Sequence, residues 1–365
     1  MAAPARSTVL SWTTVVPVVG VLVLVATWGR ALSLVPVVLV AIVLAATVLA
    51  AVHHAEVVAL RVGEPFGSLV LAVAVTVIEV ALIVTLMASG GPGASSLARD
   101  TVFAAVMITT NGIVGIALLL GAFKRDTTLF NAEGSGAALA TVMTLATLSL
   151  VLPTFTTSHP GPQFSGPQLV FAALASLVLY GIFVFTQTVR HRYFFLPVTE
   201  EGVIETEEHA EVPTGKAVLL SLGLLLMALI AVVGLAKVES PAIEAGIRAV
   251  GFPSSFVGVV IALLVLLPET IAAARAAWRD RIQTSLNLAY GSAIASIGLT
   301  IPSIALASVW LTGPLTLGLG PVQMILLLVT VLASVLTVVP GRATRLQAGV
   351  HLVLLAAFVF LAVNP

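Results

Sequence analysis

Long hydrophobic runs recur along the whole chain, separated by short segments rich in polar, glycine and proline residues. Each run approaches or exceeds the roughly 20 apolar residues that a helix needs to cross a bilayer. Helices are expected because lipid offers no backbone hydrogen bonds and because membrane-barrel strands are much shorter. We predict about eleven transmembrane helices, over residues 10–28, 33–60, 65–88, 100–123, 136–155, 166–190, 216–238, 254–277, 283–311, 320–340 and 343–363.

The composition supports an all-α polytopic membrane protein embedded in a lipid bilayer. The chain is 59% hydrophobic and 9% charged, whereas a typical soluble domain has about 25% charged residues. The absence of cysteine excludes disulfides and thiolate metal sites. The formal net charge of zero gives no indication of a nucleic-acid partner.

The arrangement of the spans suggests two related halves. The only long hydrophilic connection, residues 196–215, separates the sixth span from the seventh. Without the first span, five remain on each side, so the two halves enter the membrane from opposite faces, as in the inverted repeats of many transporters. The predicted organisation is an N-terminal helix, a first repeat, an acidic linker and a second repeat, over residues 1–30, 31–195, 196–215 and 216–365.

The basic residues predict the orientation in the cell membrane, because cytoplasmic loops are enriched in lysine and arginine. With a cytoplasmic N-terminus, twelve of the 16 basic residues face the cytoplasm and four face outward, and the C-terminus lies outside. The cytoplasmic set is Arg6, Arg61, Lys124, Arg125, Arg190, Arg192, Lys216, Arg275, Arg279, Arg281, Arg342 and Arg345, and the outer set is Arg30, Arg99, Lys237 and Arg248.

Two acidic residues lie near the centre of a span. Glu79 interrupts "AVAVTVIEVALIVTLM" in the third span, and Glu269 lies in "LLVLLPETIAAA" of the eighth. These spans are the second helix of each half, so inverted symmetry would bring the two carboxylates together at the midplane. A charge at the bilayer centre costs about 2.5–3.5 kcal/mol on insertion scales. Two such residues at matching positions indicate a function.

The chemistry of a carboxylate pair favours a cation site. Two carboxylates neutralise one divalent ion, and Ca²⁺ prefers oxygen ligands. When empty, the pair should bind protons, because burial and mutual repulsion both disfavour two charges. Protons and metal would then compete for the same oxygens, which is the basis of exchange. The alternative is that Glu79 and Glu269 are protonated and only tie helices together by hydrogen bonds.

Pro268, immediately before Glu269, should interrupt the eighth span. Proline lacks a backbone donor and disrupts the preceding helical turn. The carbonyl of Leu264 or Val265 would then be free to face an ion, since broken helices commonly line transport sites. A simple packing kink is the alternative interpretation.

Other polar residues within spans are candidates for the pathway. Asn111 lies in mid-span in "ITTNGIVG", and we favour a functional role for it. Ser292 and Ser296 lie on one face of the ninth span, with Ser285 and Thr300. This stripe could coordinate ions or could serve close helix packing through small residues.

Two stretches carry a resemblance to a known family. They are "HAEVVALRVGEPFGSLVLAVAVTVIEVALI", residues 54–83, and "FVGVVIALLVLLPETIAAARAAWRDRIQTSLNLAYGSAIASIGLTIP", residues 256–302. They resemble the two alpha repeats of the calcium/cation antiporter superfamily, in particular bacterial calcium/proton antiporters of the ChaA type. The resemblance implies that Glu79 and Glu269 bind cations and protons, and Glu56 matches a further acidic position of the family pattern.

The resemblance implies a secondary antiporter that exports Ca²⁺ from the cytoplasm in exchange for H⁺, without a cofactor. The broader family pattern has Gly-Asn four and three residues before each glutamate. Here those positions hold Val75 and Thr76, and Val265 and Leu266. The site is therefore poorer in polar ligands, and exchange of Na⁺ or K⁺ stays open. Thr76 is a candidate accessory ligand.

Acidic residues outside the span centres have more ordinary explanations. Glu64, at the start of the third span, could recruit cations or simply favour a helix N-terminus. The acidic residues at 200–211 could sense Ca²⁺, but a solvated linker is the more common role of such a charge run.

An intramembrane enzyme and a cation channel are the alternatives to an antiporter, and the sequence favours them less. An intramembrane serine enzyme would need a base beside a nucleophile such as Ser135, and the pattern around that residue does not supply one. A cation channel could use the carboxylate pair, but channels usually repeat one subunit around a pore. The ion stoichiometry and the oligomeric state are left open by the sequence.

Overall fold

The computed structural model describes residues 11–30, 32–63, 66–88, 90, 93–198, 213–311 and 313–365. Glu64 and the acidic residues at 200–211 lie outside these ranges, so their predicted roles stay untested.

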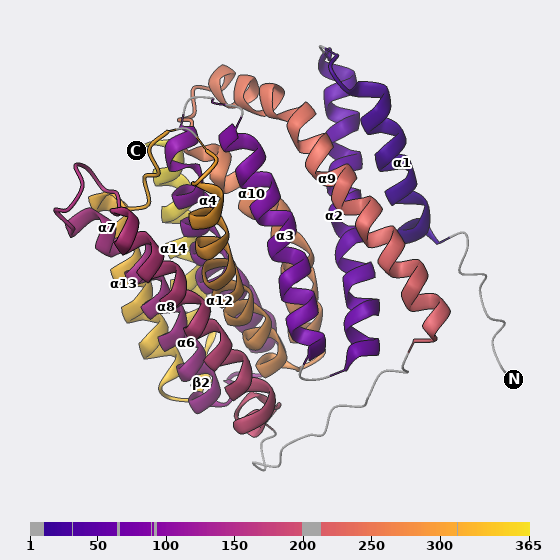
Figure 1. The fold of residues 1–365 in the computed structure, drawn as a ribbon. Helices are drawn as coiled ribbons and strands as arrows, with labels where there is room; N and C mark the ends of the chain where they lie inside the picture. The colour runs from indigo at the N-terminus through magenta and orange to yellow at the C-terminus, as the bar shows by residue number, and fades with distance from the viewer. Residues whose placement is uncertain are drawn as a thin grey trace, which may run out of the picture. The chain divides into compact units, whose positions relative to one another are not determined.

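Helices account for most of the described chain (Figure 1). The α-helices are α1 (Trp12–Thr27), α2 (Leu34–Val62), α3 (Phe66–Ala88), α4 (Leu97–Met107), α5 (Val114–Lys124), α6 (Ala132–Ala146), α7 (Leu152–Phe155), α8 (Gly166–Phe185), α9 (Gly215–Ala249), α10 (Phe256–Val265), α11 (Leu267–Trp278), α12 (Ile282–Ala307), α13 (Pro321–Val338) and α14 (Arg345–Val363).

Short segments extend or join these helices. They are the 3₁₀ turns η2 (Ala94–Ser96) and η6 (Arg192–Phe195) and the π-helical segments η3 (Ile108–Ile113), η4 (Thr147–Val151) and η5 (Thr186–Arg190). Two short strands, β1 (Thr128–Leu129) and β2 (Arg342–Ala343), pair in antiparallel fashion.

The helices coincide with the predicted spans, and the all-α membrane fold is confirmed. Within the described residues, eight continuous helical stretches are long and apolar enough to cross a membrane, and the bent pair α10–α11 would be a ninth. α1 and the Ala72–Ala88 part of α3 are apolar but shorter. All eleven predicted ranges therefore contain a helix, while the count of eleven complete spans stays a prediction.

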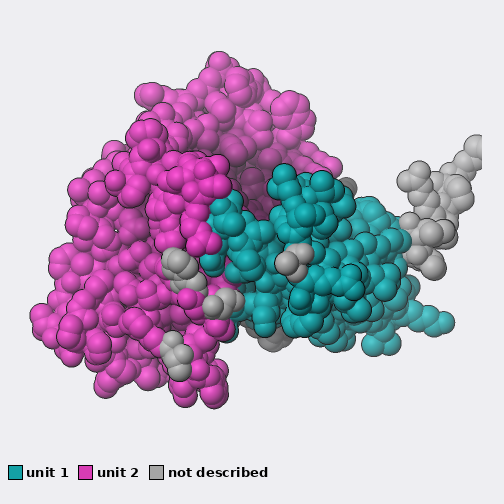
Figure 2. Space-filling model, turned by 90° about the horizontal axis from the view of Figure 1, so that it is seen from above, with its two compact units in different colours: residues 1–85, 210–246 teal, residues 86–209, 247–365 magenta. Residues whose placement is uncertain are grey.

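The chain forms two compact units, coloured separately in Figure 2. Unit 1 comprises residues 1–85 and 210–246, and unit 2 comprises residues 86–209 and 247–365. Each unit contains helices from both predicted repeats. The division into compact units therefore differs from the division into sequence halves, and the repeats stay a prediction.

Unit 1 contains α1, α2, most of α3 and most of α9. A buried histidine, His54 on α2, links three of these helices. Its Nε2 lies 2.9 Å from the carbonyl of Thr13 on α1, and its Nδ1 lies 3.2 Å from Oγ of Ser221 on α9. Both ring nitrogens are engaged in polar contacts between helices, so His54 holds α1, α2 and α9 together.

Unit 2 is organised around α12, which packs against α5, α6, α8 and α11. The third helix of one predicted half packs on the last helix of the other in both directions: α12 lies against α8, and α5 lies against α14. This reciprocal packing is the pattern expected of two halves that interlock by inverted symmetry.

Close contact between α10 and α4 in unit 2 depends on a glycine. A Cβ atom built on Gly258 would lie 2.7 Å from the backbone nitrogen of Thr101 and 2.8 Å from the carbonyl carbon of Asp100. These neighbours are backbone atoms, so they cannot rotate away, and α10 would have to shift. In contrast, Gly181 on α8 has no atom within 4 Å of the same position.

We expect Gly258→Ala to lower the free energy of unfolding by about 1–3 kcal/mol, the usual cost of overpacking a core. Gly181→Ala is the matched control and should leave stability unchanged or slightly increased. The measurement is the midpoint of thermal unfolding of the purified full chain in detergent. An unchanged midpoint for Gly258→Ala would show that α10 and α4 do not meet closely at this position.

Candidate functional site

Glu79 lies inside α3, and its side chain is withdrawn from solvent. The residue is 4% exposed, and Thr76, one turn earlier on the same helix face, is 6% exposed. The helix around them is otherwise apolar. The carboxyl group of Glu79 and the hydroxyl group of Thr76 thus lie on the same face of α3. This helix is the second helix of the first predicted half.

Glu269 lies directly after a break in its span. α10 ends at Val265, α11 begins at Leu267, and the two axes differ by 54°. Pro268 occupies the first turn of α11, so the break predicted from this proline is present. Because Pro268 has no N–H, it cannot serve the carbonyl of Leu264 as an ordinary helical residue would.

The break also places Glu269 in a favourable electrostatic position. It is the one acidic residue in the first turn of α11. Aligned peptide dipoles give a helix N-terminus a partial positive charge, which stabilises a carboxylate there. The hydroxyl of Thr270 donates to the carbonyl of Leu266 at 2.7 Å, and its backbone N–H donates to the same oxygen at 2.9 Å. The first turn of α11 is thereby held in place.

The face of α11 that carries Glu269 packs against α12. Ala273 and Ala277, four and eight residues after Glu269, are fully buried. The hydroxyl of Ser285 on α12 donates to the carbonyl of Ala273 at 2.9 Å. Glu79 belongs to unit 1 and Glu269 to unit 2, so each is described in its own unit and their pairing stays a prediction.

The accessory residues are distributed over both units. Glu56 is exposed on α2 in unit 1. Ser296 is buried and Ser292 is half-buried on α12 in unit 2. Their roles in an ion pathway stay predictions.

Asn111 lies in a buried polar network in unit 2, within the π-helical segment η3. Its Nδ2 donates to Oγ1 of Thr330 on α13 at 3.0 Å, and its Oδ1 lies 3.2 Å from Nδ1 of His351 on α14. The Nε2 atom of His351 lies 3.1 Å from Oγ1 of Thr337. An amide oxygen can only accept, so Nδ1 of His351 carries the hydrogen and Nε2 accepts from Thr337.

The network assigns Asn111 a structural role that the sequence did not indicate. Its donor and its acceptor are both engaged by residues of α13 and α14, which clamp the π-helical segment. Such segments leave some backbone groups without their usual partners and are frequent at functional sites. The role of Asn111 in the ion pathway stays a prediction, and it would require an amide that already contacts Thr330 and His351.

We expect His351→Ala to destabilise the protein strongly, since Oδ1 of Asn111 and the hydroxyl of Thr337 each lose their contact with the imidazole, at about 1–3 kcal/mol per group. His351→Gln retains hydrogen-bonding groups and should lose less. Thermal unfolding of the full chain in detergent measures both. Equal midpoints for His351→Ala and wild type would contradict the clamp.

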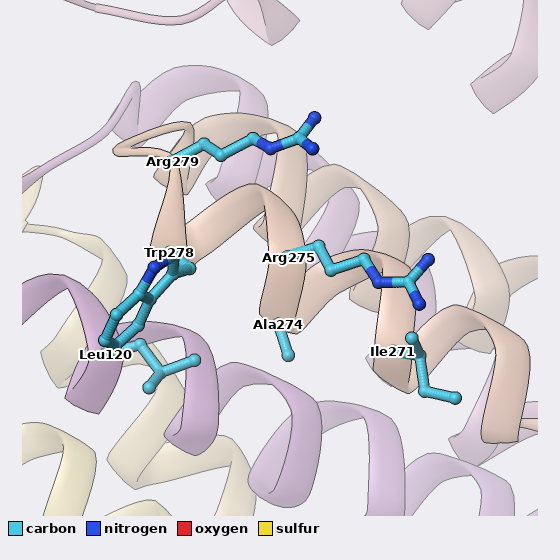
Figure 3. A pocket seen from close by; sticks show the side chains of 6 residues that line it. All are labelled: Leu120, Ile271, Ala274, Arg275, Trp278 and Arg279. Carbon is cyan, nitrogen blue, oxygen red and sulfur yellow. The ribbon is translucent and has the colours of Figure 1, made fainter.

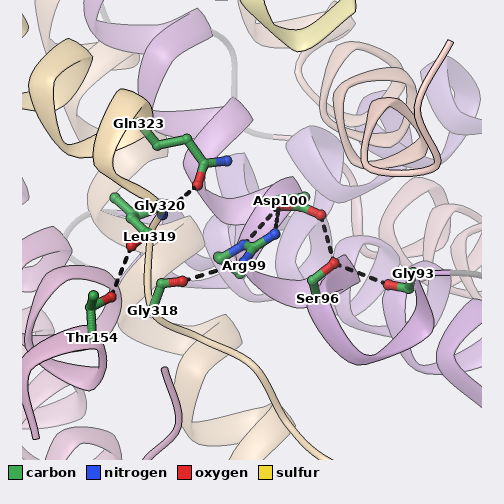
Figure 4. A network of polar contacts seen from close by, with 9 residues as sticks. All are labelled: Gly93, Ser96, Arg99, Asp100, Thr154, Gly318, Leu319, Gly320 and Gln323. Carbon is green, nitrogen blue, oxygen red and sulfur yellow. Dashed lines mark hydrogen bonds and ion pairs between the residues drawn. The ribbon is translucent and has the colours of Figure 1, made fainter. Parts of the chain in front are cut away.

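A second polar cluster in unit 2 fixes the start of α4 (Figure 4). Arg99 Nη2 and Asp100 Oδ1 lie 2.8 Å apart, and Ser96 Oγ donates to Asp100 Oδ2 at 2.9 Å. Arg99 also donates to the carbonyl of Gly318 at 3.3 Å. The carboxylate is paired and hydrogen-bonded, so this cluster joins α4 to the segment that leads into α13 rather than offering an ion site.

Glu239 on α9 is a buried carboxyl group that the sequence pattern did not reveal. It is 2% exposed, and its Oε1 has no hydrogen-bond partner among the described residues. The seventh span is predicted to end at residue 238, whereas α9 continues to Ala249 through Pro241. Because Pro241 and Gly246 in "KVESPAIEAGIRA" favour the end of a helix, the sequence carries no signal that α9 continues past Glu239.

Comparisons with known proteins identify the family. The chain matches the sodium/calcium exchanger protein family over residues 31–189 and 220–364. It is 45% identical over 357 residues to a Sinorhizobium fredii protein whose name describes an ionic transporter, covering 97% of this chain and 96% of that relative. It is 34% identical over 307 residues to the sodium-potassium/proton antiporter ChaA of Escherichia coli, covering 84% and 83%.

A solved structure agrees with the fold. Native YfkE, a Ca²⁺/H⁺ antiporter, superposes with a TM-score of 0.72 at 13% identity, covering 97% of this chain and 99% of that chain. The family match and the 34% identical relative confirm the resemblance inferred from the two glutamate-containing stretches. The chain belongs to the sodium/calcium exchanger family within the calcium/cation antiporter superfamily, and is a multi-pass cation/proton or cation/calcium antiporter, not an enzyme.

Proposed function

We propose that this antiporter exports Ca²⁺ from the cytoplasm in exchange for protons, with Glu79 and Glu269 as the carboxylates that bind both. The observation that carries the proposal is a carboxyl group in the second helix of each predicted half, one of them in the first turn after a helix break. We further propose that the protein lies in the cell membrane with its N-terminus in the cytoplasm.

Charge compensation supplies the mechanism. Inside a membrane protein, an isolated carboxylate is costly unless a proton or a cation neutralises it. Two carboxylates can be neutralised by one Ca²⁺ or by two protons, so each state excludes the other. Alternating access would open the site to one side at a time, as in other transporters built from inverted repeats. Exchange follows because the empty site, with both carboxylates charged, would cost too much free energy to switch its access from one side of the membrane to the other.

The residues before the two glutamates favour a second candidate, Na⁺ or K⁺ in place of Ca²⁺. Val75, Val265 and Leu266 carry no side-chain oxygen, and Thr76 offers a single hydroxyl. Ca²⁺ takes six to eight oxygen ligands, so backbone carbonyls and water would have to supply most of them. The relative with 34% identity is named as a sodium-potassium/proton antiporter.

We expect Glu79→Gln and Glu269→Gln each to reduce exchange by more than about 100-fold, since loss of one partner in a buried charged site costs about 3–5 kcal/mol. Everted vesicles from a host without its own antiporters are energised with a proton gradient. A pH-sensitive dye then reports its dissipation by Ca²⁺, Na⁺ or K⁺ added in turn. The cation that wild type responds to identifies the substrate.

Glu133→Gln is the matched control, because it removes the same charge from an exposed position at the start of α6. It should exchange like wild type. If Glu79→Gln and Glu269→Gln also exchange like wild type at equal expression, the proposed site is wrong. If dissipation occurs with a channel-like conductance and no counter-cation, antiport itself is contradicted.

Proton competition also predicts the direction of the pH dependence. Apparent cation affinity should rise with pH, because the same oxygens release protons before they bind metal. The rise is about tenfold per pH unit if one proton leaves per ion and about 100-fold if two leave. Initial exchange rates over a range of cation concentrations, at several pH values, measure this. An affinity independent of pH would separate the proton site from the cation site.

A further inference from the structure

One end of unit 2 is strongly basic. Contacts join the ends of its helices there: Lys124 donates to the carbonyl of Trp278, Arg345 donates to that of Ala122, and Arg125 pairs with Asp280 at 3.3 Å. The basic residues of this end are Lys124, Arg125, Arg275, Arg279, Arg281, Arg342 and Arg345. In the orientation proposed above from the positive-inside rule, this end faces the cytoplasm.

A groove of about 500 Å³ opens at this end, between α5 and α11 (Figure 3). Its lining combines apolar and cationic groups, from Leu120, Ile271, Ala274, Arg275, Trp278 and Arg279. Figure 3 shows the indole of Trp278 beside Leu120, with the two guanidinium groups extending from α11 on the other side. None of the described residues that line the groove is acidic.

The groove lies on the face of α11 that points away from the ion-binding carboxyl group. Its four α11 residues and Arg279, which directly follows the helix, have the i, i+3, i+4, i+7, i+8 spacing of a single helix face. Glu269 precedes Ile271 by two residues, which places it on the opposite side at 3.6 residues per turn. A transported cation would be repelled by the two arginines. The groove is therefore separate from the ion pathway.

We propose that this groove binds an anionic phospholipid. Its phosphate would lie between Arg275 and Arg279, one helical turn apart, and an acyl chain would lie along Leu120, Ile271 and Ala274. Basic pockets between transmembrane helices at the cytoplasmic side suit anionic head groups, and tryptophan is enriched at that depth. The apolar residues of the groove offer free phosphate no favourable contact but suit an acyl chain, which favours a lipid as the occupant.

The two arginines are available for such a ligand. Both are exposed, and neither pairs with an acidic residue in the described part of the chain. The nearest acidic residue along the chain, Asp280, is already paired with Arg125. Trp278 is held in place, since Lys124 donates to its carbonyl and lies over its ring, with Nζ 5.0 Å from the ring centroid.

Quenching of Trp278 fluorescence by brominated lipid tests the proposal directly. The purified full chain in neutral detergent is titrated with acyl-brominated phosphatidylglycerol or phosphatidylcholine. The signal of Trp278 is the difference between wild type and Trp278→Phe, which removes the contribution of the other tryptophans. We expect phosphatidylglycerol to quench at an at least about tenfold lower mole fraction than phosphatidylcholine, corresponding to about 1.4 kcal/mol.

Two double variants locate the charge that is responsible. Arg275→Gln with Arg279→Gln should abolish the preference for phosphatidylglycerol. Arg281→Gln with Arg342→Gln removes two exposed cations of the same end from outside the groove, and should keep the preference.

Several results would overturn the proposal. Equal quenching by the two lipids in wild type would do so even if a variant failed to fold. Loss of the preference in both double variants would indicate diffuse attraction, and its retention in both would exclude the two arginines. Relief of the quenching by millimolar inorganic phosphate would indicate a phosphate site instead of a lipid site.

Discussion

A carboxyl group within a membrane must be neutralised, and the exchange mechanism proposed for this antiporter depends on that constraint. Glu79 is almost fully withdrawn from solvent, in a chain with only 9% charged residues. The cost of a bare charge at this depth makes the protonated and the cation-bound states the two stable alternatives. In the proposed mechanism, a site with these two states exchanges one ion for the other, and the remaining features hold the carboxyl groups in place.

The helix break before α11 is the clearest of these features. Pro268 ends the hydrogen-bond ladder of α10, turns the chain by 54°, and starts a new helix whose first turn contains Glu269. The site thereby gains a helix dipole and a carbonyl without its helical donor. The other buried polar clusters differ in kind. The Arg99–Asp100 pair and the Asn111–His351 contact are satisfied by partners within unit 2 and fix helix positions.

The sequence predicted what depends on transfer free energy and on local backbone chemistry. The spans follow from apolar length, the break follows from Pro268, and the candidate carboxyl groups follow from charge in mid-span. It could not predict what depends on tertiary partners. The amide of Asn111 contacts Thr330 and His351, which are remote in the chain, and its role in the ion pathway stays a prediction. The burial of Glu239 depends on the continuation of α9 past residue 238, where the sequence predicts the end of a span.

Proton release on cation binding tests the central claim most directly. The purified full chain in weakly buffered detergent is titrated with Ca²⁺, Na⁺ or K⁺, and the heat of binding and the protons released are recorded together. The account predicts that the transported cation displaces between one and two protons per ion bound, and that Glu79→Gln and Glu269→Gln each lower that number. Cation binding without proton release, in wild type near neutral pH, would contradict it.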